Sequence, residues 1–154
     1  MVAVRRRVNA TAGAHRSGKL HDRAVYSDDI GKNLPMKKFL AVYMGTMYDE
    51  KFKAFMAMPE ADRKKTEAAG MAAWGAWMQE YAPHILDNGG PLGKTKKTDM
   101  GGVSDTKNDL SGYVVLQAES HEDAAKMFEN HPHFTIFPGT SVEIMEILDM
   151  PQTA

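Results

Sequence analysis

Four short segments of the chain have the apolar pattern of β-strands. They span residues 39–44, 92–100, 112–118 and 142–148, and the second has a weaker strand character than the other three. The first, FLAVYM, is nearly all apolar, which predicts a central strand covered on both faces. The second, LGKTKKTDM, is rich in lysine, which indicates a sheet edge or a solvated face. Residues 101–109 are expected to form a loop or a hairpin connection.

Two segments between the first two strands have the pattern of helices. Residues 49–58 predict a short helix that is closed off at Pro59. Residues 59–85 predict a longer helix, because large side chains repeat three and four residues apart along it. These side chains are Met71, Trp74, Met78, Tyr81 and Ile85. Pro83 should kink the last turn of this helix or end it early, and residues 88–91, NGGP, predict a turn.

A further helix is predicted between the last two strands. Ser120 has the residue type and position of an N-cap, and acidic residues follow it in the first turn. Pro132 should stop the helix, because the residue before a proline is driven out of the helical conformation. Residues 134–140 predict a loop. One face of the helix would carry Ala124, Ala125, Phe128 and His131.

The order of these elements is β-α-β-β-α-β. It is typical of α+β proteins with a ferredoxin-like fold, in which two helices cover one face of a four-stranded antiparallel sheet. The chain has 154 residues, of which 43% are hydrophobic and 25% are charged. These values fit one ordinary soluble domain with a proper core.

Composition excludes several classes of protein and site. The chain has no cysteine, which excludes a disulfide framework, a thiol nucleophile and a cysteine-based zinc site. No stretch approaches the roughly 20 apolar residues that span a bilayer. The formal net charge of −1 gives no reason to expect nucleic acid or a membrane surface as a partner.

The N-terminal segment, residues 1–35, differs from the rest of the chain. It holds seven Lys or Arg against three Asp, a net charge of +4, and has no periodic apolar pattern. We interpret it as a disordered basic extension that precedes one domain, residues 36–154. Its origin could be a start codon assigned upstream of Met36, an organellar targeting segment, or a nucleic-acid-binding arm. It has no apolar secretory region, so we expect a cytoplasmic protein.

The order and spacing of several motifs resemble the YCII-related family. The motifs are MKKFLAVYMG, AAWGAWMQEY, NGGPLG, LSGYVVLQAES, HEDAAKMFEN, HPHF and SVEIMEI, and they cover residues 36–150. The resemblance implies a ferredoxin-like fold that pairs into a dimeric α/β barrel. It also implies a homodimer whose subunits each have a cleft between sheet and helices.

The resemblance does not supply the catalytic pair proposed for some members of that family. In those members an acidic residue before the proline at the end of the second helix pairs with a histidine on the first long helix. Here the acidic position is His131, and the corresponding part of the first helix carries Ala73, Trp74 and Trp77. A histidine–aspartate pair therefore cannot be carried over to this chain.

His131 is the candidate catalytic residue. Its predicted place at a helix C-terminus favours the imidazolium form, which could act as an acid or base or bind a carboxylate. The alternative is that it only caps the last carbonyls of the helix. His133 could assist it or could be a turn residue. A metal site built on His131 and His133 would need a third and a fourth ligand, and although the sequence offers His84 and Asp87, spacing alone does not nominate them. We predict no metal and no cofactor.

Aromatic and apolar side chains could line a ligand pocket beside His131. The candidates are Tyr43, Trp74, Trp77, Met78, His133 and Phe134. The alternative is that they belong to the core, or that Tyr43 makes a barrel or dimer contact.

Two functional hypotheses follow. One is a cofactor-independent enzyme that acts on a small organic substrate. The aromatic side chains of the candidate pocket favour an aromatic substrate. The other is a non-catalytic dimeric module that binds a metabolite or another protein. A third, nucleic-acid binding, would depend on the basic residues 1–35.

Overall fold

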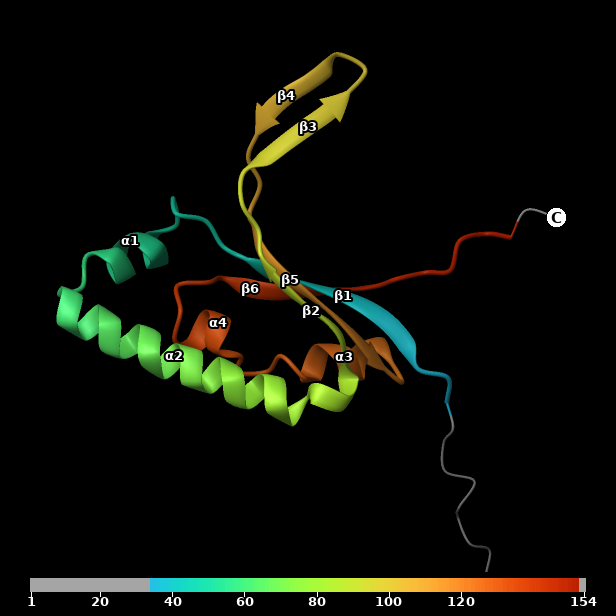
Figure 1. Cartoon of the computed structure of the whole chain (residues 1–154), viewed down its shortest axis with the longest axis horizontal. Coiled ribbons are helices and arrows are strands. Elements are labelled where there is room, and N and C mark those ends of the chain that lie inside the picture. Colours follow the sequence, from blue (N-terminus) through green and yellow to red (C-terminus); the bar gives the residue numbers. More distant parts are fainter. Residues whose placement is uncertain (1–33, 153–154) are drawn as a thin grey trace, which may run out of the picture. The chain divides into compact units, whose positions relative to one another are not determined.

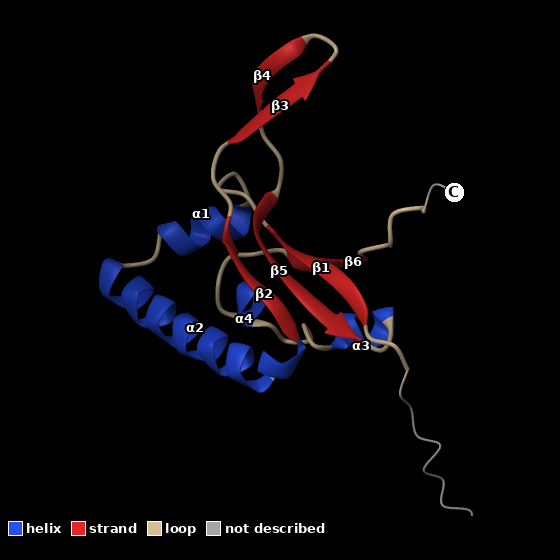
Figure 2. Cartoon of the chain, turned by 45° about the vertical axis from the view of Figure 1, so that its right-hand side comes forward, coloured by secondary structure: helices blue, strands red, loops and turns tan. Residues whose placement is uncertain are grey.

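A four-stranded antiparallel sheet with helices on one face forms the centre of the protein (Figures 1 and 2). The structure is a computed structural model, and it describes residues 34–152. The elements in chain order are β1 (Lys37–Met44), α1 (Glu50–Met56), α2 (Glu60–Glu80), the short 3₁₀ helix η1 (Ala82–His84), β2 (Ile85–Pro91), β3 (Thr95–Asp99), β4 (Gly102–Thr106), β5 (Leu110–Ala118), α3 (His121–Lys126), α4 (Pro132–Thr135) and β6 (Ser141–Glu146).

The predicted fold class is confirmed. The strands of the main sheet lie in the order β2-β5-β1-β6, and all neighbouring pairs are antiparallel. This is the strand order of a ferredoxin-like fold, with the β3–β4 hairpin inserted between its second and third strands. The predicted extension, residues 1–35, lies outside the described residues except for Leu34 and Pro35, which form no helix or strand.

The core lies between the sheet and the helices. Alternate residues of the central strand β1, namely Phe39, Ala41 and Tyr43, are buried and face the helices. Their neighbours on β5 and α3 complete the core, which includes Val114, Leu116, Ala118, Ala124 and Phe128. Every described helix lies on the same side of the sheet, so the prediction that β1 is covered on both faces is not met by helices within residues 34–152, although Val42 on the other face is also buried.

The second strand of the sheet is β2, not the predicted strand 92–100. Residues 88–91, predicted as a turn, lie within β2 and pair with β5 through two irregularities in register. Gly89 has a φ of +60°, and any Cβ there would collide with the backbone of Tyr113. The sequence of β2, ILDNGGP, contains two glycines and a proline and few β-branched residues, so it lacks the composition by which strands were predicted.

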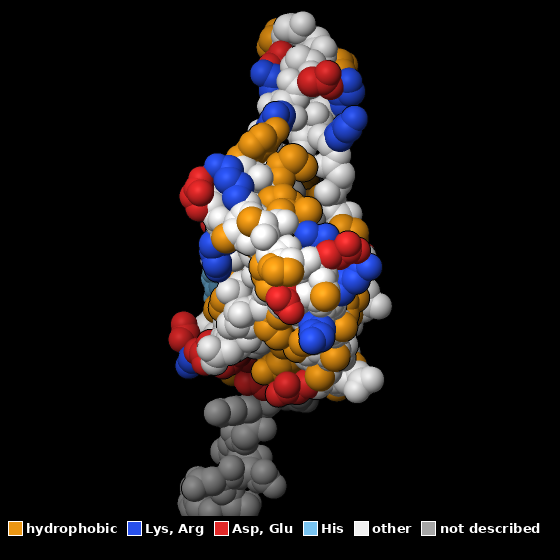
Figure 3. Space-filling model, turned by 90° about the vertical axis from the view of Figure 1, so that its left-hand side faces the viewer, with side chains coloured by type: hydrophobic (Ala, Val, Ile, Leu, Met, Phe, Trp, Pro, Cys, Tyr) orange, Lys and Arg blue, Asp and Glu red, His pale blue; other side chains and the backbone are white. Residues whose placement is uncertain are grey.

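Residues 94–107, which we call the arm, form a separate two-stranded sheet. β3 and β4 pair in register from Thr95 with Thr106 to Asp99 with Gly102. Residues 101–109 were predicted to form a loop or a hairpin connection, but residues 102–106 form β4, and the turn of the hairpin lies at residues 100–101. Figure 3 shows lysine, aspartate and hydrophobic side chains all facing solvent on it.

The helices begin largely where the sequence predicts, but all three predicted helices end earlier than predicted. Asp49 caps α1, and Ser120 caps α3 by accepting from the backbone N–H of Asp123. α2 ends at Glu80, and Pro83 lies in the 3₁₀ helix that follows it. This agrees with the prediction that Pro83 ends the long helix early.

The helix predicted to run to His131 ends instead at Lys126. Asn130 takes a left-handed conformation, with a φ of 55°, which redirects the chain. Pro132 then begins α4 instead of stopping α3, and it lies at a first helical position that proline favours. Among the described residues, no helix is long and apolar enough to cross a membrane.

Candidate functional site

His131 is the N-cap of α4. The sequence predicted a helix C-terminus at this position, which is wrong because α3 ends five residues earlier. The backbone N–H of His133 donates to Nδ1 of His131 at 3.1 Å. The imidazole therefore performs the task that Ser, Asp or Asn performs at most helix starts.

The His131 ring is neutral. A backbone N–H can only donate, so Nδ1 must be unprotonated and Nε2 must carry the hydrogen. His131 is completely buried, and burial, with a smaller contribution from the neighbouring His133, lowers its pKa from 6.5 to about 4. The expectation that a helix dipole holds the imidazolium form is thus overturned.

The Nε2–H group of His131 is buried without a hydrogen-bond partner among residues 34–152. Aromatic rings from three elements surround it instead. Ring centroids lie 5.3 Å from Tyr43, 4.7 Å from Trp74, 4.7 Å from Trp77 and 5.5 Å from Phe128. Both indoles are nearly perpendicular to the imidazole, and a π face is only a weak acceptor. Leaving a buried donor unpaired costs about 1–3 kcal/mol, so this group needs an explanation.

His133 is held by a different set of contacts. Its Nε2 donates to the carbonyl of Met44 at 2.8 Å, which assigns the proton to that nitrogen. Burial is the largest cause that lowers its pKa, and the nearby Lys51 ammonium acts in the same direction. Lys51 donates to the carbonyl of Gly139 at 3.0 Å and so ties α1 to the segment before β6. Gly139 has no side chain that would collide with the His133 ring.

Most of the predicted pocket side chains lie in the core. Trp77 is 7% exposed, and its indole N–H donates to the carbonyl of Met127 at 2.7 Å. Tyr43 is 5% exposed, and burial raises the pKa of its phenol, which therefore stays protonated. Trp74 is half-buried, and its ring packs at a tilt against Tyr43, with the ring centroids 4.8 Å apart. Met78 packs on the edge of the core.

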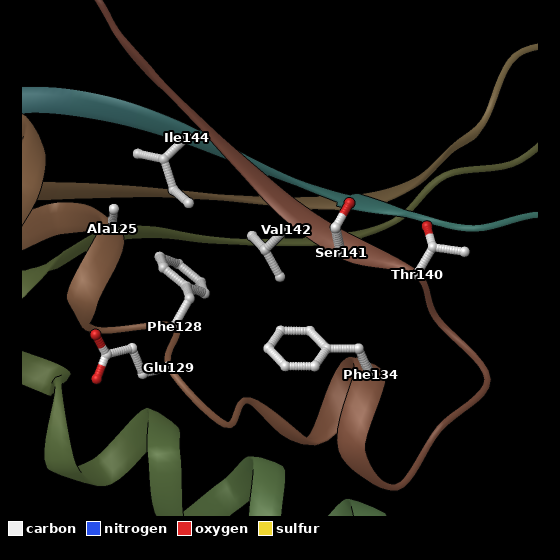
Figure 4. Close-up of a pocket in the computed structure, with 8 residues that line it drawn as sticks. All are labelled: Ala125, Phe128, Glu129, Phe134, Thr140, Ser141, Val142 and Ile144. Atoms are coloured by element: carbon white, nitrogen blue, oxygen red, sulfur yellow. The ribbon is translucent and has the colours of Figure 1, made fainter.

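The structure thus brings together Tyr43, Trp74, Trp77, His131 and His133. Phe134 is apart from them and lines a pocket of about 340 Å³ between β6 and the α3–α4 segment. Figure 4 shows the Phe128 and Phe134 rings extending into this space beneath the β6 side chain Val142. The remaining lining residues are Ala125, Glu129, Thr140, Ser141 and Ile144.

Phe128 belongs to both the pocket and the ring cluster. Its ring lines the cavity and also packs on the imidazole of His131, so one side chain separates the two. The sequence analysis placed Phe128 on the same face as His131 but did not nominate it as a site residue. The signal that could have found it is their three-residue spacing, combined with the alternation of Val142 and Ile144 along β6.

No cluster of three or more His, Cys, Asp or Glu side chains suited to a metal ion occurs within the part of the chain that the structure describes.

Comparison with known proteins adds little about function. No protein-family model matches the chain, so its resemblance to the YCII-related family stays a prediction, and no curated protein is significantly similar to it. One solved structure that is similar is 5-chloro-2-hydroxyhydroquinone dehydrochlorinase (TftG) from Burkholderia phenoliruptrix AC1100, in complex with 2,5-dihydroxybenzoquinone. The sequences are 18% identical, the match covers 70% of this chain and 90% of that chain, and the TM-score is 0.40. Similarity at this level does not define a function.

Proposed function

We propose that the protein binds a small, planar, oxygen-bearing organic molecule in the pocket beside β6, and that it acts on this molecule through His131 without a cofactor. The observation that carries the proposal is the buried Nε2–H of His131, which has no partner in the described chain and lies one ring away from a cavity. A ligand oxygen would supply the missing acceptor.

The pocket suits a ligand of this class. Its volume is about 340 Å³, and it is an open hollow on the surface, so a ligand with a single substituted ring would lie partly in solvent. Phenylalanine and aliphatic side chains form most of its wall, whereas Thr140, Ser141 and the carboxylate of Glu129 supply the polar groups. A ligand would reach His131 only by displacing the whole Phe128 side chain, which is buried and packs against Trp77 and His131.

The protonation state of His131 limits what it can do. An imidazole with a pKa of about 4 is a weak base at neutral pH and carries no charge. It can donate its Nε2 hydrogen to a carbonyl or phenolic oxygen, and this stabilises negative charge that develops there when an adjacent carbon loses a proton. Glu129 is the carboxylate available in the pocket to accept that proton. The reaction class is proton transfer, with isomerisation or elimination as its outcomes.

The protein would work as a homodimer. The sheet face opposite the helices bears apolar side chains from neighbouring strands, because Leu40 pairs with Val115 on β5 and with Met145 on β6. Leu86 and Met145 are 47% and 44% exposed. An uncovered apolar sheet face is the kind of surface that a second copy would cover.

Non-catalytic binding is the second candidate function, and the complete burial of His131 favours it. In that case His131 would only cap α4 and pack among the rings, and no bond of a ligand held in the pocket would change.

The test is a screen of phenols, quinones and cyclic ketones against the full chain, with ligand-observed NMR for binding and mass spectrometry for products. The His131→Asn variant keeps an acceptor close to the position of Nδ1 but removes Nε2. His84→Asn is the matched control, since His84 lies on η1 and belongs neither to the pocket lining nor to the rings around His131.

We expect the wild type to turn over a ligand of this class, and His131→Asn to lower the turnover rate by about 100-fold or more. Ligand affinity should fall by less in this variant, and the control variant should keep the wild-type rate and affinity. Binding without turnover would identify a binding module. Failure of every oxygen-bearing ring to bind the wild type would overturn the proposal.

A further inference from the structure

We infer that Asn88 deamidates in the folded protein through attack by the backbone nitrogen of Gly89, with Asp87 as the base that accepts the proton of that nitrogen. All three residues belong to β2, an edge strand of the main sheet, and none of them lines the pocket beside β6. The inference is therefore independent of the proposed function.

Asn88 and Gly89 lie where β2 departs from regular pairing with β5. The register shifts between Asp87 and Gly90, and the two residues between them lie opposite the single residue Val114. This is the two-against-one arrangement of a β-bulge, in which the longer strand has a residue left out of the ladder. The Gly89 nitrogen accordingly donates to a side chain and not to the backbone of β5.

The fold requires glycine at position 89, and glycine leaves its own nitrogen unshielded. With a φ of +60° and the Tyr113 carbonyl close by, residue 89 has no room for a Cβ. Asn88 is exposed, so its side chain is free to turn toward the next nitrogen in the chain. The attack closes a five-membered ring within one chain, which requires no second molecule to be brought into place.

Asp87 is already in contact with the nitrogen that would attack. The Gly89 N–H donates to Oδ1 of Asp87 at 2.8 Å. A general base must lie within about 2.6–3.2 Å of the atom whose proton it takes. A backbone amide is a poor nucleophile until it loses this proton, so the carboxylate contacts the atom that needs activation.

The reaction balances without a cofactor or an oxidant. The Gly89 nitrogen gives its proton to Asp87 and forms a bond to Cγ of Asn88. The bond from Cγ to Nδ2 then breaks, and Nδ2 leaves as ammonia with the proton that Asp87 held, which gives a succinimide. Water opens the succinimide at either carbonyl, to aspartate or to isoaspartate. Either product places a second carboxylate beside Asp87, and isoaspartate also lengthens the main chain of β2 by one methylene.

The other asparagines that the structure describes lack this arrangement and serve as internal comparisons. The Asn108 side chain is held at both ends, because it accepts from the Leu110 N–H and donates to the Thr95 hydroxyl. Asn130 precedes His131, which is completely buried and whose backbone nitrogen donates to a carbonyl three residues earlier. Only Asn88 among these three is followed by glycine.

The test follows the purified full chain at neutral pH over time by peptide mapping with tandem mass spectrometry, which locates each deamidated residue and separates isoaspartate from aspartate. Asp87→Asn keeps an acceptor oxygen for the Gly89 N–H but is not a base, and Asp87→Ser does the same without adding an asparagine. Asp62→Ser is the matched control, since Asp62 is an exposed aspartate in the first turn of α2. Each protein is also incubated unfolded in urea.

We expect aspartate and isoaspartate to accumulate at position 88 of the folded wild type, faster than at Asn108 or Asn130. Both Asp87 variants should slow this reaction by about tenfold or more, whereas the Asp62 variant should keep the wild-type rate. In urea, where Asp87 is no longer held against Gly89, all four proteins should react at position 88 at the same rate.

Two results would overturn the inference. Folded Asp87 variants that react as fast as the wild type, or faster, would show that the hydrogen bond to Asp87 does not activate the nitrogen. An Asn88 that stays intact in the folded wild type while it deamidates in urea would show that the bulge protects this site.

Discussion

The backbone N–H of His133 donates a 3.1 Å hydrogen bond to Nδ1 of His131. This single contact starts α4 and also determines which nitrogen of the buried imidazole carries the hydrogen. Capping and protonation state are therefore coupled, and the other nitrogen is left as a donor among aromatic rings.

Substitution of His131 should separate its capping role from its packing role. We expect His131→Ala to lower the free energy of unfolding by about 3 kcal/mol, because it leaves a cavity and removes the cap. His131→Ser leaves a similar cavity but restores an oxygen acceptor, so it should be more stable than the alanine variant by about 1 kcal/mol. Urea titration of both variants measures this difference. Equal stabilities would show that the bond to His133 contributes nothing.

Stability should fall as the solution becomes more acidic. The pKa of His131 is about 4 in the folded protein and 6.5 in the unfolded chain, so below pH 6.5 protons bind preferentially to the unfolded chain. This contribution to stability is complete above about pH 6.5. It is lost progressively between pH 6.5 and about 4, for a total of about 3 kcal/mol. Burial lowers the pKa of His133 too, which adds a change of the same sign.

Urea titrations at pH 7, 5.5 and 4.5 would measure the loss. The dependence of the free energy of unfolding on pH should become weaker in His131→Asn. Val142→Ala destabilises the protein without removing a titrating group, so it should keep the wild-type dependence on pH. An unchanged slope in His131→Asn would contradict the lowered pKa.

Two glycines of α2 should respond in opposite ways to alanine. A Cβ at Gly70 would lie 2.5 Å from the Phe137 ring, whereas a Cβ at Gly75 meets nothing within 4 Å. Gly75→Ala should therefore stabilise the protein by about 0.5–1 kcal/mol, since alanine favours the helix. Gly70→Ala should destabilise it by about 1–3 kcal/mol through overpacking. Thermal unfolding of the two variants provides the measurement, and shifts of the same sign would contradict the packing around Phe137.

The indole of Trp77 should contribute more than its hydrophobic area. Trp77→Phe removes the donor to the Met127 carbonyl and leaves that buried oxygen unpaired, a loss of about 1–3 kcal/mol beyond the loss of contact area. Trp74→Phe removes the same atoms at a half-buried position and should cost less. Denaturant titration would compare the two, and an equal cost would indicate that the Trp77 hydrogen bond is not formed in solution.

Local signals in the sequence determined much of the architecture. The apolar run of β1, the alternation of β5 and the N-cap Ser120 each depend on a few neighbouring residues. Pro83 ended α2 for an equally local reason, because proline cannot continue a helix. These features are sufficient to predict β1, β5, the end of α2 and the start of α3, but they do not identify the second strand of the sheet.

Tertiary structure alone decided the features on which function depends. The glycine-rich β2 is a strand only because β5 supplies its hydrogen-bond partners, and residues 92–100 lie in the arm because β2 already occupies the sheet edge beside β5. His131 is neutral because rings from β1, α2 and the end of α3 remove it from water. Propensity and capping act over a few residues, whereas strand pairing and desolvation depend on residues brought together from distant parts of the chain.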